Sequence, residues 1–138
     1  MIGSLAYALR GSRHSLIVLR GDSTTAFDGN GVTDLYRLAT AGSDALRGAA
    51  VADKIIGRAA MALLLLCGAK EIYGEVMSSL ALSLPRDNNV TVTYGTLVHH
   101  IRARHGDGWC PLEERLAHCL TPEDCYAQIA AFMEHNGR

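Results

Sequence analysis

The adjacent residues Asp53 and Lys54 are the first candidates for chemistry, because an acid and a base adjoin a long apolar segment. The pattern of residues 51–60 (VADKIIGRAA) predicts that this pair opens a helix between two strand-like segments. A helix start favours negative charge, since its first N–H groups are unpaired and its dipole is positive there. Asp53 is therefore either a capping residue beside a solvated Lys54, or an acid/base group beside a lysine that holds a phosphate or carboxylate.

Arg58 follows Lys54 by four residues, which on one helix places both side chains on the same face. The two cations then form a small patch that could bind an anionic ligand, although such a patch is commonly just solvated surface. The small residues Gly57, Ala59 and Ala60 indicate close packing of the same helix. Lysine is scarce, with Lys54 and Lys70 against eleven arginines, so a lysine at a strand edge is notable.

A second cluster of chemically capable residues occupies positions 106–113 (GDGWCPLE). The glycines allow unusual backbone angles or close approach to a ligand. Cys110 directly precedes a predicted helix, where a lowered thiol pKa would suit a nucleophile or a metal ligand. The alternative is a cysteine buried as a small hydrophobe with a capping Glu113. The predicted ligand-binding residues are Lys54, Arg58, Asp107, Gly108, Trp109 and Glu113, and the candidates for catalysis are Asp53, Lys54 and Cys110.

The remaining histidines and cysteines give weaker signals. His99 and His100 are adjacent, so on an extended segment they point to opposite faces and cannot easily share a metal. His105 could reach the 106–113 loop, and Glu75 ends a predicted strand at the sheet edge where sites form. The four cysteines form no C-x-x-C pair, which favours reduced thiols in a cytoplasmic protein.

The elements that must position these residues read as a mixed α/β chain. We expect a lead helix over residues 1–9, a hairpin over 15–20 and 24–28, and a helix over 34–41 capped by Thr33. Strands then follow at 48–51, 71–76 and 90–96. They alternate with helices at 52–66 and at 78–84, the latter capped by Ser78 or Ser79. Helices at 112–119 and after Thr121 complete the chain. This order predicts a three-layer αβα domain with a sheet of about five strands and helices on both faces.

Composition describes an ordinary globular protein of 138 residues with 49% apolar and 20% charged residues. A net charge of −1 provides no field that would attract nucleic acid. Residues 1–10 lack the pattern of a signal peptide, and the apolar run 59–67 is too short to span a bilayer. We therefore expect one cytoplasmic domain without nucleic-acid or membrane partners.

Three segments together resemble a known bacterial family: residues 51–81 (VADKIIGRAAMALLLLCGAKEIYGEVMSSLA), then VTVTYG, then GDGWCPLEERL. The family is the uncharacterised domain of unknown function 1893. Its ADK-x-x-G and GDG-x-CP motifs make the resemblance fairly specific over about residues 13–118. The resemblance implies a fold similar to that of the cytidine deaminases, with residues 119–138 as an added C-terminal helix.

The residues do not carry the zinc chemistry that this fold would suggest. A zinc deaminase needs a His or Cys with a nearby Glu on one helix and Pro-Cys-x-x-Cys on the next. The two expected helix starts carry Ala52-Asp53-Lys54 and Val76-Met77-Ser78-Ser79 instead. The expectation is thus a deaminase-like scaffold with no metal and no cofactor; a metal site rebuilt from Asp53, Cys110 and Glu113 is a less favoured alternative.

Three hypotheses about function remain open at this point. The first is a site for a small anionic or nucleotide-like ligand between Asp53, Lys54 and the 106–113 loop. The second is a cysteine-dependent enzyme that uses Cys110 with Asp53, Lys54 or His105. The third is a structural or regulatory homo-oligomer, with Ile129, Phe132 and Met133 of the last helix as its interface.

Overall fold

The computed structural model describes residues 2–29, 31–104, 106 and 108–136. Five strands form one mixed sheet in the order β2-β1-β3-β4-β5. The strands are β1 (Leu16–Arg20), β2 (Ser23–Phe27), β3 (Ala50–Ile56), β4 (Glu71–Ser78) and β5 (Thr91–Val98). β1 pairs antiparallel with both β2 and β3, whereas β3, β4 and β5 run parallel. The predicted αβα architecture with a mixed five-stranded sheet is thereby confirmed.

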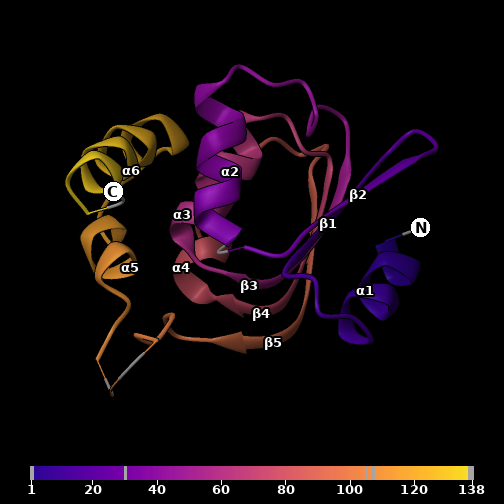
Figure 1. Ribbon diagram of the computed structural model, residues 1–138. Helices are drawn as coiled ribbons and strands as arrows, with labels where there is room; N and C mark the ends of the chain where they lie inside the picture. Colours follow the sequence, from indigo (N-terminus) through magenta and orange to yellow (C-terminus); the bar gives the residue numbers. More distant parts are fainter. Residues whose placement is uncertain (1, 30, 105, 107, 137–138) are drawn as a thin grey trace.

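Helices cover both faces of the sheet, but very unequally (Figure 1). On one face lies α1 (Ile2–Arg10) alone, whose Leu5, Ala6 and Leu9 pack on Ile17 and Tyr73. The other helices lie on the opposite face and enclose the main core. They are α2 (Gly31–Thr40), α3 (Arg58–Leu66), α4 (Ser79–Leu82), α5 (Pro111–Leu116) and α6 (Pro122–Asn136). No helix in the described part of the chain is long and apolar enough to cross a membrane.

The strand β3 is the main departure from the predicted elements. A strand over residues 48–51 followed by a helix from Ala52 was expected, but the strand runs to Ile56 and α3 begins only at Arg58. A short apolar run does not distinguish a buried strand from a buried helix by periodicity. Pairing on both sides decides the matter, since Asp53 lies opposite Leu16 of β1 and Gly74 of β4. The prediction that Asp53 and Lys54 open a helix is therefore wrong.

Helix caps were predicted with mixed success. The Ser78 hydroxyl accepts a hydrogen bond from Ala81 N at 3.1 Å, and Thr121 Oγ1 accepts one from Asp124 N at 3.1 Å, so both of these caps are confirmed. Thr33 was expected to cap α2, but that helix begins at Gly31 and encloses Thr33. Asp34 is in the first turn in either case, where its negative charge is favoured.

The C-terminal helix α6 is part of the core. Ile129 is fully buried in the main cluster, and Phe132 and Met133 pack against it. Of the three residues expected to form an interface between copies, Ile129 is thus enclosed within the chain, and Phe132 and Met133 are partly buried against the same core.

Candidate functional site

Asp53 and Lys54 leave the strand in opposite directions, because successive side chains of a strand alternate between its faces. Lys54 shares the α1 face with Ala50 and Ala52, and its Nζ donates to the carbonyl of Ser12 at 3.0 Å. Asp53 shares the other face with Val51, within the main core. The predicted pairing of Lys54 with Arg58 as one cationic patch is wrong for the same reason, since Lys54 belongs to β3 and Arg58 to α3.

Asp53 is a buried carboxyl group with an unmet hydrogen-bond requirement. It is 2% exposed; Oδ1 accepts from Ile55 N at 3.3 Å, while no described residue donates to Oδ2. Burial raises the pKa of Asp53 to about 7, and the nearby charge of Asp34 adds to the rise, against the lowering effect of backbone N–H groups at Ile55 and Lys54. An aspartate with such a pKa exchanges its proton near neutral pH.

Asp34 is another buried carboxyl group, and Asp34 and Asp53 are called the acidic pair below. It is 8% exposed, its Oδ1 is 3.2 Å from the Arg37 guanidinium, and no described residue donates to its Oδ2. Within the described chain these two Oδ2 atoms are the buried side-chain polar atoms that lack a partner. A buried polar atom without a hydrogen bond costs about 1–3 kcal/mol, so two neighbouring examples call for an explanation.

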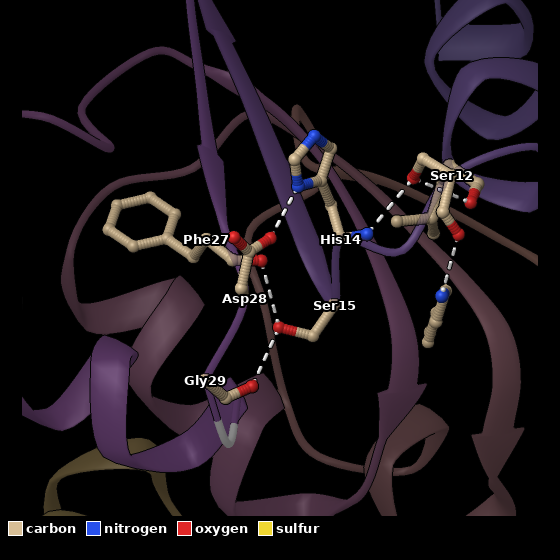
Figure 2. A network of polar contacts seen from close by, with 8 residues as sticks. Ser12, His14, Ser15, Phe27, Asp28 and Gly29 are labelled. Carbon is tan, nitrogen blue, oxygen red and sulfur yellow. Dashed lines mark hydrogen bonds and ion pairs between the residues drawn. The ribbon is translucent and has the colours of Figure 1, made fainter.

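Asp34 of the acidic pair lies against the backbone of Gly29. A Cβ atom at Gly29 would lie 3.0 Å from Asp34 Oδ2, so the glycine backbone passes directly over this oxygen. Ser15 holds the passage in place, with its Oγ 2.8 Å from Gly29 O and 3.0 Å from Phe27 O. Figure 2 shows these contacts beside the exposed ion pair of His14 with Asp28. The network fixes the backbone of Phe27 and Gly29 beside Asp34.

Glu113 fills the start of α3 from within the chain. It is 3% exposed, and its two oxygens accept from Arg58 N at 2.7 Å and from Ile101 N at 3.0 Å. Gly57 makes this possible, because a Cβ there would lie 2.9 Å from Glu113 Oε1. The helix N-terminus that could have received an external anion is thus occupied by the protein's own carboxylate.

The side chain of Arg58 is buried, with 6% of its surface exposed, and it contacts other segments of the same chain. Its guanidinium donates to the carbonyls of Cys119 and Leu80 and to Ser83 Oγ. The side chain therefore ties α3 to α4 and to the connection before α6. Predicted ligand contacts of Arg58 and Glu113 would have to replace bonds that already satisfy both groups.

Residues 108–110 fold back on the chain that precedes them. Ala103 N donates to Gly108 O at 2.8 Å, and Cys110 N donates to Ile101 O at 2.9 Å. Trp109 stacks on His100 with ring centroids 4.2 Å apart and planes 11° apart. The predicted roles of Asp107 and His105 fall outside the described residues. The described residues contain no group of three His, Cys, Asp or Glu side chains arranged to hold a metal.

Cys110 is half-buried, packs against the main core and precedes α5. Burial raises the pKa of the Cys67 thiol and raises that of Cys125 to about 12. Since the thiolate is the reactive form, we expect iodoacetamide at about pH 8 to modify Cys110 and Cys119 well before Cys67 and Cys125. Peptide mass spectrometry over a time course measures this order. Modification of Cys125 first, in folded protein, would contradict it; rapid modification of Cys110 below about pH 7 would favour a catalytic thiol.

Sequence reasoning missed Asp34 because nothing in the residues around it distinguishes a buried aspartate from an ordinary first-turn aspartate. It found Asp53 but grouped it with Lys54 and the 106–113 loop, whereas in the structure the carboxylate near enough to add to its raised pKa is that of Asp34. Asp53 is placed by the pairing of β3 with β1, and Asp34 by α2, whose Leu35 is buried in the main core.

A protein of known structure that resembles this chain has a similar fold. The crystal structure of a DUF1893 family protein from Thermotoga maritima superposes with a TM-score of 0.79, at 24% identity over 94% of this chain and 88% of that one. No curated protein matches the sequence. The profile of the domain of unknown function DUF1893 matches residues 4–133, a span that includes most of α1 and most of α6. The chain therefore belongs to the DUF1893 family.

Proposed function

We propose that this protein binds a small molecule at the acidic pair, through a ligand group that donates N–H bonds to Asp34 and Asp53. The observation that carries the proposal is the presence of two buried carboxyl groups, each with an oxygen that no described residue satisfies. A protonated amine, an amidine or the amino edge of a nucleobase-like heterocycle would supply donors to both oxygens. Asp53, with a pKa of about 7, could also accept or return a proton from such a group.

The proposal changes the ligand charge expected from sequence. An anionic ligand was predicted because Lys54 and Arg58 were expected beside Asp53 at one helix start. In the folded chain Lys54 donates to Ser12 on the other face, and Arg58 donates to main-chain carbonyls. The unsatisfied groups that remain on this side of the sheet are acceptors, which favours a ligand with donors.

The scaffold is proposed to be cytidine-deaminase-like, as the motifs suggest. Support comes from the antiparallel hairpin followed by three parallel strands, with α2 and α3 beginning on the same side of the sheet. These two helix starts replace the ones expected from sequence, since residues 52–54 belong to β3 and residues 76–78 to β4, and they do not fit a zinc ion either. Val32-Thr33-Asp34 and Arg58-Ala59-Ala60 include no His or Cys, the ligands that zinc deaminases use there. No step is therefore assigned to a metal.

A melting-temperature screen tests the proposal with benzamidine, 2-aminopyrimidine, cytosine and adenine, and with inorganic phosphate and pyrophosphate as anionic probes. We expect at least one donor probe to stabilise the wild-type protein, and the effect to be lost in Asp53→Asn and Asp34→Asn. Gly29→Ala should weaken binding while keeping both carboxylates, because its Cβ would approach Asp34 Oδ2.

Asp28→Asn is the matched control, since Asp28 is exposed and pairs with His14. It should leave probe binding unchanged. Stabilisation by phosphate or pyrophosphate that survives Asp53→Asn, with no effect of any donor probe, would overturn the proposal.

A further inference from the structure

The strand β5 is a free edge of the sheet. It pairs with β4 and with no other described strand, and Figure 1 shows no element beyond it. Thr91 N donates to Lys70 O at 2.9 Å, so the backbone of Thr91 faces β4. Because the direction alternates along a strand, the N–H and C=O groups of Val92, Tyr94, Thr96 and Val98 face outward. No main-chain bond to these outward groups is seen among the described residues.

This edge lacks the features that usually prevent strands from pairing with other chains. Edge strands are commonly short, charged, bulged or interrupted by proline. β5 instead spans eight residues (TVTYGTLV) without a charge or a proline, whereas β2 at the opposite edge spans five. Tyr94 and Leu97 are 43% and 40% exposed, so apolar side chains accompany the unpaired backbone.

We propose that β5 pairs antiparallel with β5 of a second copy of this chain, which joins two five-stranded sheets into one across a two-fold axis. In this arrangement Val92 pairs with Val98 and Tyr94 with Thr96 of the other copy, each pair exchanging two main-chain bonds. The inference does not depend on ligand binding at the acidic pair.

A second copy fits this edge because its own β5 presents the same outward N–H and C=O groups. The strand is uncharged, so antiparallel self-pairing places no like charges opposite each other. The histidines that follow the strand, His99 and His100, would lie opposite Thr91 and Val90 of the other copy, which are also uncharged.

Size-exclusion chromatography with light scattering on the full chain tests the pairing. We expect a concentration-dependent mass that approaches twice the 14.8 kDa of the chain. Thr96→Lys places a charge on the edge and should return the mass to that of a monomer. Thr24→Lys on the exposed edge strand β2 is the matched control and should leave the dimer intact.

Hydrogen exchange identifies the interface independently of the substitution. The amides of Val92, Tyr94, Thr96 and Val98 should exchange more slowly at high protein concentration in wild type, and this protection should be lost in Thr96→Lys. A monomeric mass at every concentration overturns the proposal. So does a dimer whose outward β5 amides stay unprotected, or one that survives Thr96→Lys.

Discussion

The free energy of unfolding should fall as the pH rises from about 4 to about 7. The titration of Asp53 alone should lower it by up to about 4 kcal/mol over this range. The buried carboxyl group has a pKa of about 7 in the folded protein, against about 3.9 for an aspartate in the unfolded chain. Between those values the folded state binds more protons than the unfolded state. The contribution of Asp53 to the free energy of unfolding is therefore fully present below its pKa in the unfolded chain. This contribution is lost as the pH rises through its pKa in the folded protein.

Urea unfolding of wild type and Asp53→Asn at several pH values isolates this contribution. The asparagine carries no titrating proton, so its stability relative to wild type should increase across the window and be greatest at about pH 8. Asp44→Asn provides the control, because Asp44 is an exposed partner of Arg47 and its loss should shift stability little at any pH. Parallel pH profiles for wild type and Asp53→Asn would show that Asp53 is ionised in the folded protein throughout.

Replacement of Glu113 by alanine should lower the free energy of unfolding by about 3 kcal/mol. The carboxylate is buried and accepts from Arg58 N and Ile101 N, so its removal leaves one buried and one half-buried donor without their partner. Glu113→Gln keeps one acceptor oxygen and should cost less, about 1–2 kcal/mol. Denaturant unfolding measures the changes, and faster hydrogen exchange at Arg58 and Ile101 would locate them.

The neighbouring exposed Glu114 supplies the comparison for Glu113. Glu114→Ala removes the same charge from the same helix and should change stability by less than about 0.5 kcal/mol. Equal effects of the two alanine substitutions would mean that Glu113 does not stabilise the start of α3.

The fold was largely predictable because its signals are local. The hairpin of β1 and β2, the strand β4, the cap at Ser78 and the start of α6 follow from turn residues, apolar runs and hydroxyl groups within a few positions. The end of β3 was not predictable in this way. The sequence AVADKII suits either a buried strand or the first turns of a helix, and pairing with β1 and β4 selects the strand.

The candidate site shows the same division. From its residues alone, the sequence determined an α/β domain, the family motifs and Asp53 as an unusual residue. Tertiary structure decided which groups Asp53 meets. Strand alternation sends Lys54 to the face of α1, the packing of α2 brings Asp34 toward Asp53, and Glu113 closes the start of α3 from 55 positions away in the chain. Contacts between such distant residues depend on the packing of whole elements, which local patterns of residue type do not encode.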